Sequence, residues 1–317
     1  MSTDVLVLRR GVHGRPIEGY VAALRERLPD REVRLARTPA EERELIADAR
    51  VVTGLDVTEE LLARAEALEL FACLYAGVDH LPLAAFEERG IPVTSAAGVH
   101  APNVAEYVRG SILADAQGLV EGWRREQRRE WRHFQTGELA GSTVAVVGLG
   151  SIGTAVVERL SPFGVETVGV RYSPEKGGPT DEVLGYDDDL HAAYARSDYL
   201  VLTCPLTERT EGMIDGSAFE TLPPDSVLVN VARGPVVDTD DLVEALRGQL
   251  VGGAVLDVTD PEPLPEDHPL WTLSNVRITP HNAGDTPQYY DRVAEILAAN
   301  LGRLAGEADE PLENRAA

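Results

Sequence analysis

One short segment constrains the fold of this chain more than any other. The apolar run TVAVV at 143–147 is followed directly by GLGSIG at 148–153 and then by a helical stretch. A glycine-rich turn between a buried strand and a helix is typical of the first unit of a dinucleotide-binding parallel sheet. Gly148 allows the tight turn, Gly150 lets the backbone approach a pyrophosphate, and Gly153 lets the helix pack closely on the strand. The first amides of the helix, which would face the phosphates, belong to Ser151 and Ile152.

The rest of the chain alternates short apolar runs with amphipathic helical stretches, a pattern that predicts doubly wound parallel sheets. The candidate strands of the first hundred residues are Val5–Leu8, Val33–Leu35, Val51–Thr53, Leu70–Leu74 and Val93–Ser95, with helices at Ile17–Leu28 and Thr58–Leu68 between them. Later strands are predicted in the runs at 143–150, 165–172, 199–206, 226–234, 252–258 and 276–281. Two further helices are expected at Pro102–Gly118 and Pro287–Leu304.

The chain is too long, at 317 residues, for one compact core, so two domains are expected. If the helix at 287–304 packs back on the first hundred residues, the first domain is built from both termini. We therefore expect a dinucleotide-binding domain at 100–284, inserted into a substrate domain made of residues 1–99 and 285–317. Both would be Rossmann-like α/β domains with a cleft between them.

The composition restricts where the protein is expected to be located and which partners it is expected to bind. The first residues lack the pattern of a signal peptide and no apolar run reaches eighteen residues, so we expect a cytoplasmic protein that does not enter a membrane. The formal net charge is −24, with 53 acidic residues against 29 Lys plus Arg, so neither nucleic acid nor an anionic membrane is an expected partner. Two explanations of the acid excess stay open: a GC-rich genome that favours Arg over Lys, or a halophilic protein adapted to molar salt.

The second strand of the nucleotide domain ends without the acidic residue that usually binds the ribose hydroxyls of NAD. Arg171 stands there instead, with Ser173 and Lys176, the only lysine of the chain, close behind. A guanidinium at this place suits a 2′-phosphate, so NADP(H) is the expected cofactor and NAD(H) is possible. The alternative is that Arg171 is a solvated surface residue and that NAD binds all the same.

Three charged residues each follow a strand in the second half of the chain: Arg233 in NVARG, Glu262 in DVTDPEPL and His281 in TPHNAG. Loops at the carboxyl ends of parallel strands converge, so these residues can meet in space. Reduction of a 2-oxo acid needs a cation for the substrate anion, a proton donor and a group that keeps this donor charged. Arg233, His281 and Glu262 can supply these in that order. The other histidines have no comparable setting: His13, His80, His100, His133, His191 and His268.

The chain resembles the D-isomer-specific 2-hydroxyacid dehydrogenase family over nearly its whole length. The resemblance rests on these motifs together with LYAGVDHL at 74–81, NVAEY at 103–107 and CPLTERT at 204–210. The resemblance implies that Arg233, Glu262 and His281 are catalytic and that the backbone amides of Ala76 and Gly77 hold the substrate carboxylate. It further implies that Asp257 bonds the nicotinamide carboxamide and that three residues line the cofactor cleft: Cys204, Pro205 and Thr210.

Family members are usually homodimers joined through the nucleotide domain, and the arm GWRREQRREWRHF at 122–134 is expected to contribute. Trp131 would reach the partner's active site or, more simply, anchor the interface. The predicted activity is reversible, stereospecific reduction of a small 2-oxo acid to a 2-hydroxy acid. Alternatives are a dinucleotide-sensing corepressor that binds protein partners, and oxidation of phosphite or phosphoglycerate within the same family. Glu262 stands where formate dehydrogenases of this superfamily carry glutamine, so formate is not an expected substrate.

Overall fold

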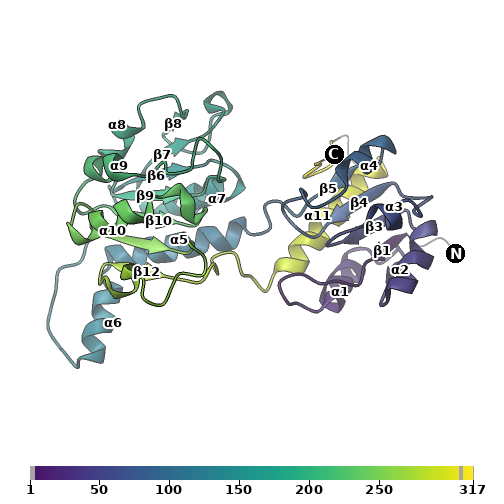
Figure 1. Ribbon diagram of the computed structural model, residues 1–317, viewed down its shortest axis with the longest axis horizontal. Helices are drawn as coiled ribbons and strands as arrows, with labels where there is room; N and C mark the ends of the chain where they lie inside the picture. Colours follow the sequence, from purple (N-terminus) through teal and green to yellow (C-terminus); the bar gives the residue numbers. More distant parts are fainter. Residues whose placement is uncertain (1–3, 307–309, 317) are drawn as a thin grey trace. The chain divides into compact units, whose positions relative to one another are not determined.

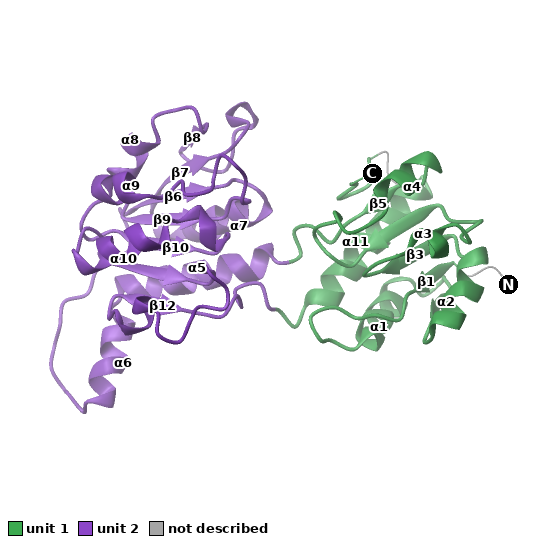
Figure 2. Ribbon diagram, in the orientation of Figure 1, with its two compact units in different colours: residues 1–99, 286–317 green, residues 100–285 purple. Residues whose placement is uncertain are grey.

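The structure is a computed structural model in which residues 4–306 and 310–316 are described. The chain divides into two compact units, residues 1–99 with 286–317 and residues 100–285 (Figure 2). Each is built on a sheet whose named strands all pair in parallel, with helices between the strands. The predicted fold class, two doubly wound α/β domains with one inserted into the other, is confirmed. Asp285 belongs to the inserted unit.

The first unit has, within the described residues, a five-stranded sheet of order β2-β1-β3-β4-β5 (Figure 1). The N-terminal helix α1 packs against the C-terminal helix α11, so both ends of the chain build this unit. Its strands are β1 (Val5–Val7), β2 (Val33–Leu35), β3 (Val51–Gly54), β4 (Leu70–Cys73) and β5 (Val93–Thr94), and its helices are α1 (Ile17–Arg27), α2 (Pro39–Leu45), α3 (Glu59–Leu62), α4 (Leu83–Glu88) and α11 (Tyr289–Leu304).

The second unit has, in the part of the chain that is described, a seven-stranded sheet of order β12-β11-β10-β9-β6-β7-β8. The strand order reverses between β6 and β9, which is where doubly wound sheets bind dinucleotides. Its strands are β6 (Thr143–Val147), β7 (Glu166–Val170), β8 (Glu182–Leu184), β9 (Tyr199–Leu202), β10 (Val227–Asn230), β11 (Gly253–Leu256) and β12 (Val276–Ile278). Its helices are α5 (Ala101–Ala116), α6 (Leu119–Gln127), α7 (Ser151–Leu160), α8 (Leu190–Tyr194), α9 (Gly216–Thr221) and α10 (Thr239–Arg247).

The two faces of each sheet carry separate apolar clusters, because successive side chains of a strand point to opposite faces. In β6, Val144 and Val146 pack in one cluster, while Ala145 and Val147 pack in the other. A strand that is buried on both faces must be apolar throughout, which explains the continuous run TVAVV.

One local prediction was wrong, and one strand was not predicted. The helix expected at 58–68 ends at Leu62, because the backbone continues in turns and Arg89 of the first unit donates to the carbonyls of Leu62 and Ala65 that a longer helix would use. Strand β8 was not predicted, since it lies at the sheet edge and two of its three residues, Val183 and Leu184, are only half-buried. Among residues 4–306 and 310–316, no helix combines the length and the apolar character that a membrane span requires.

Candidate active site and cofactor pocket

The glycine-rich turn between β6 and α7 has the close packing that its sequence predicts. Gly148 has a φ of +104°, and a Cβ atom there would lie 2.6 Å from the backbone nitrogen of Cys204. A Cβ atom on Gly153 would lie 2.1 Å from the carbonyl oxygen of Gly148, so α7 can approach the turn only with glycine at this position. Gly150 has open space at its Cα, and it precedes the N-terminus of α7 (Ser151–Leu160). This open helix start, with its unpaired amides, fits a phosphate group.

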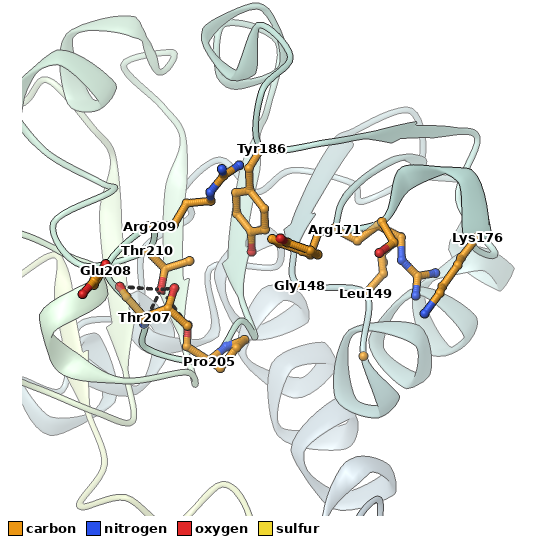
Figure 3. Close-up of a pocket in the computed structure, with 13 residues that line it drawn as sticks. Gly148, Leu149, Arg171, Lys176, Tyr186, Pro205, Thr207, Glu208, Arg209 and Thr210 are labelled. Carbon is orange, nitrogen blue, oxygen red and sulfur yellow. Dashed lines mark hydrogen bonds between the residues drawn. The ribbon is translucent and has the colours of Figure 1, made fainter.

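A pocket of about 750 Å³ lies beside this turn (Figure 3). It is bounded by the turn itself, by the segment after β7, by Tyr186 after β8 and by the loop after β9. These four segments belong to neighbouring strands around the reversal of strand order, so the pocket lies where this type of sheet binds a dinucleotide. Its lining residues are Gly148, Leu149, Gly150, Arg171, Tyr172, Ser173, Lys176, Tyr186, Pro205, Thr207, Glu208, Arg209 and Thr210.

Two cations line the pocket after β7. Arg171 is half-buried, and its Nη1 donates to the carbonyl oxygen of Gly177 at 2.5 Å, which ties the guanidinium to the following turn. Lys176 closes that turn, and Figure 3 draws the charged ends of Arg171 and Lys176 at the same end of the pocket. Ser173 also lines the pocket. Such a group of donors without a carboxylate fits an anion better than a pair of ribose hydroxyls.

Three predicted cofactor residues lie in the loop after β9, and their surroundings differ. Pro205 and Thr210 line the pocket, but the Thr210 hydroxyl donates to the Pro205 carbonyl at 2.7 Å and thereby closes the loop. Cys204 is 2% exposed and lies beneath the glycine turn. Burial raises the pKa of its thiol to about 11, so Cys204 contributes backbone and packing, not a reactive sulfur.

The predicted acid–base pair forms at the carboxyl ends of β11 and β12. His281 Nδ1 lies 3.1 Å from Glu262 Oε2, and the other carboxylate oxygen of Glu262 accepts a hydrogen bond from the Thr259 amide at 3.0 Å. The glutamate is therefore held from behind and directed at the imidazole. About half of the His281 side chain is exposed (53%), so its other ring nitrogen, Nε2, is available to a ligand. A carboxylate bonded to Nδ1 orients the imidazole ring, as a positioned proton donor requires.

Asp257 is 3% exposed and organises the loop that carries His281. One carboxylate oxygen accepts from the Thr279 hydroxyl at 2.6 Å and the Asn282 amide at 2.8 Å, and the other accepts from the Ala283 amide at 2.9 Å. The Asp257 carbonyl accepts from the His281 amide at 2.8 Å. A carboxylate offers about four acceptor positions, and these three bonds use most of them.

Arg233 follows β10, the strand beside β11. It is exposed, and its Nη1 donates to the Ala232 carbonyl at 2.6 Å. The loop after Arg233 packs tightly on the next one, since a Cβ atom on Gly234 would lie 2.0 Å from the Thr259 carbonyl oxygen. Arg233, Glu262 and His281 thus lie on consecutive strand ends of the sheet that carries the pocket.

The other predicted substrate residues, Ala76 and Gly77, follow β4 in the first unit. Both residues are exposed, and a Cβ atom on Gly77 would lie 3.9 Å from Asp79 Oδ2, an ordinary contact distance. In the described residues no group of His, Cys, Asp and Glu is arranged to hold a metal ion.

Sequence reasoning missed several residues near these sites. Tyr186 lines the pocket, but it follows the unpredicted strand β8. Arg209 also lines the pocket and forms an ion pair with Asp187 at 2.9 Å. The motif CPLTERT contains Arg209, but no role was assigned to it from the sequence. Burial raises the pKa of the Tyr186 phenol, so this group is a neutral hydrogen-bonding partner. His100, thought to have no special setting, donates from Nδ1 to the Gly284 carbonyl in the loop that follows His281.

A glycine turn that opens on a dinucleotide-sized pocket, with an acid–base pair on the same sheet edge, defines a dinucleotide-dependent α/β oxidoreductase. The family profile described as "D-isomer specific 2-hydroxyacid dehydrogenase, NAD binding domain" matches residues 110–283. The chain belongs to this family and is an NAD(P)-dependent oxidoreductase.

The glyoxylate reductase of Thermofilum pendens is 36% identical over 268 residues, which cover 82% of this chain and 78% of that protein. The D-3-phosphoglycerate dehydrogenase of Methanocaldococcus jannaschii is 33% identical over 307 residues, which cover 94% of this chain and 58% of that protein. Among solved structures, a D-isomer specific 2-hydroxyacid dehydrogenase from Xanthobacter autotrophicus Py2, in complex with NADPH and MES, is similar with a TM-score of 0.78. It is 28% identical, and the match covers 99% of this chain and 98% of that one.

Proposed function

We propose that this protein reversibly reduces a small 2-oxo acid to the D-2-hydroxy acid, with His281 as the proton donor. The contact between His281 Nδ1 and Glu262 Oε2 at 3.1 Å, on the sheet edge that also carries the cofactor pocket, is the observation that supports this most directly. The neighbouring relatives named above include a glyoxylate reductase, which makes glyoxylate and similar short 2-oxo acids the first substrates to consider.

Each residue has a defined task in this proposal. Arg233 binds the substrate anion through its guanidinium, which is always charged. The backbone amides of Ala76 and Gly77 hold the substrate carboxylate. His281 delivers a proton to the developing alkoxide, while Glu262 stabilises the imidazolium and fixes the ring. The nicotinamide cofactor, when bound, supplies the hydride.

We further propose that NADP(H) is preferred over NAD(H), which can still bind. Arg171 and Lys176 provide two positive charges at one end of the pocket, and Ser173 adds a hydroxyl donor. The related solved structure from Xanthobacter autotrophicus holds NADPH. On this basis residues 100–285 form the dinucleotide-binding domain and the first unit forms the substrate domain.

A homodimer is the proposed assembly, joined through the arm that contains α6. None of the residues of α6 (Leu119–Gln127) is buried in the described chain, and Trp123 and Trp131 are 58% and 102% exposed. The arm is also rich in arginine, in a chain whose net charge is −24. A locally basic arm that exposes two tryptophans on an acidic molecule is suited to pack on a second copy, which would cover the tryptophans.

The proposed function is tested with glyoxylate, hydroxypyruvate, pyruvate and 2-oxobutyrate, each with NADPH and with NADH, in dilute buffer and in molar KCl. We expect oxidation of NADPH with at least one of these acids and a product of the D configuration where a stereocentre forms. Phosphite and 3-phosphoglycerate with NADP⁺ serve as the competing donors. Turnover of these donors without turnover of any 2-oxo acid would reject the proposal.

A further inference from the structure

The loop that carries His281 has a conformation that needs support. His281 has a φ of +54°, in the left-handed region that non-glycine residues rarely adopt. Such a conformation persists only where the surrounding contacts determine it. Asp257 holds the loop from the sheet side, as described above. The opposite side of the loop faces helix α5 (Ala101–Ala116) and the residue just before it.

Three side chains spaced along one face of this helix bind the loop. His100 donates to the Gly284 carbonyl at 2.8 Å, and Asn103 Nδ2 donates to the carbonyls of Ala283 and Asp285 at 2.8 and 2.7 Å. The spacing of three residues places both side chains over the same loop. The fit is tight, because a Cβ atom on Gly284 would lie 3.2 Å from the His100 ring nitrogen.

The third side chain, Tyr107, reaches the loop through a relay of hydroxyls. The Thr279 hydroxyl donates to Asp257 at 2.6 Å, so it accepts from the Tyr107 hydroxyl, which lies 2.7 Å away. Tyr107 lies four residues after Asn103 and therefore on the same face of α5. Burial raises the pKa of its phenol, so the group keeps the proton that it donates. The relay joins α5 to the carboxylate that fixes the amides of Asn282 and Ala283.

We propose that this face of α5, formed by His100, Asn103 and Tyr107, positions the imidazole of His281 against Glu262. The face acts through the loop at 279–285 and touches no reacting atom, so its members are positioning residues. His100 and Asp285 are the first and last residues of the second unit, so the same bonds also fix the points where the chain enters and leaves it. The titratable groups that bond the loop are Glu262, Asp257, His100 and Tyr107, and Asp285 is its last residue.

The expected effect on catalysis rests on the proposed function, whereas the expected effect on the loop does not. Two measurements therefore test the two proposals separately. Asn103→Ala removes the two bonds that Asn103 donates to the loop, and it leaves the contacts of His100 and Tyr107 in place. The matched control is Gln117→Ala, because Gln117 directly follows α5 and its side-chain amide also donates to a backbone carbonyl, that of Gly137, at 3.0 Å. Hydrogen exchange of the loop at 279–285 is measured in the whole protein for both variants. We expect faster exchange of this loop in Asn103→Ala and no change there in Gln117→Ala.

Kinetics with the best substrate of the panel provide the second readout. We expect kcat of Asn103→Ala to fall about tenfold to a hundredfold with little change in KM for NADPH, since a small misplacement of a reacting group costs rate and not cofactor binding. Thr279→Val should behave in the same way, whereas Thr279→Ser keeps the hydroxyl and should retain kcat within about twofold.

The outcomes lead to different conclusions. Unchanged loop exchange in Asn103→Ala, or faster exchange with an unchanged kcat, would overturn the positioning role. A wild-type protein that reduces no 2-oxo acid would instead reject the proposed function, while the exchange measurement would still decide whether α5 orders the loop.

Discussion

Replacing Arg171 by aspartate should reverse the choice of cofactor. The guanidinium has five N–H donors, and the structure uses one Nη1 contact on the Gly177 carbonyl at 2.5 Å, which leaves the rest of the fork for a ligand. A hydrogen bond to a charged group contributes roughly 1.5–3 kcal/mol, which corresponds to about a tenfold to hundredfold difference in kcat/KM between NADPH and NADH. Aspartate would repel a 2′-phosphate and accept from the ribose hydroxyls. Lys176 remains in the pocket and should limit the reversal.

The assay is the ratio of kcat/KM for NADPH to that for NADH, measured in the same preparation. Arg159→Asp is the matched control, since Arg159 is also half-buried and also bonds a backbone carbonyl, that of Ala155, but does not line the pocket. It changes the net charge equally. We expect the ratio to fall at least tenfold in Arg171→Asp and to stay constant in Arg159→Asp, with a smaller difference in molar KCl because salt screens a half-exposed site. A wild-type preference for NADH that Arg171→Asp leaves unchanged would refute the role of Arg171.

Three further predictions concern the thiols, the surface charge and the assembly. Burial raises the pKa of Cys204 to about 11 and also raises the pKa of Cys73, so only about one Cys204 thiol in a thousand is ionised at pH 8. A thiol reagent should therefore label both cysteines rapidly after unfolding and neither of them rapidly in the native protein. Rapid labelling of the native protein would contradict the buried placement. A net charge of −24 should destabilise the folded state in dilute buffer, so Tm should climb steadily toward molar KCl, and a flat response would favour the genome-composition explanation over the halophilic one. Light scattering should give the mass of two chains, and the double variant Trp123→Glu with Trp131→Glu should give one; a wild-type monomer would reject the dimer.

The parts of the fold that the sequence predicts are those in which local pattern and burial agree. The run TVAVV is apolar because β6 is buried on both faces, and glycine is required at Gly148 and Gly153 because an added Cβ would lie 2.6 Å or less from backbone atoms. Strand β8 lacks such a signal because an edge strand with exposed residues needs no apolar run. The helix α3 ends at Leu62, whose carbonyl accepts from Arg89, 27 residues away, and no local pattern encodes this contact.

Some residues of the candidate site could be predicted from the sequence, and others could not. Arg171, Glu262 and His281 could be found because each follows a strand, and because the glycine-rich turn and the motifs DVTDPEPL and TPHNAG mark those strand ends. His100, Asn103 and Thr279 could not be assigned a task from sequence, since their partners are backbone carbonyls and a buried carboxylate that meet only in the folded unit. The motif TPHNAG contains Thr279 two residues before His281, so the relevant residue was visible but its bond to Asp257 was not.

The central claim is that His281 gives the proton during reduction of a 2-oxo acid, and its most direct test is kcat for that reaction in His281→Gln. His268→Gln is the matched control, since His268 lies in the same unit and its Nδ1 accepts from the Leu270 amide at 3.3 Å, in a bond that involves neither His281 nor Glu262. A positioned general acid contributes about 10²- to 10⁴-fold to the rate, so kcat of His281→Gln should fall by that factor while KM for NADPH changes little. His268→Gln should keep its wild-type kcat. A His281→Gln protein that reduces the same acid within about threefold of the wild-type rate would contradict the account.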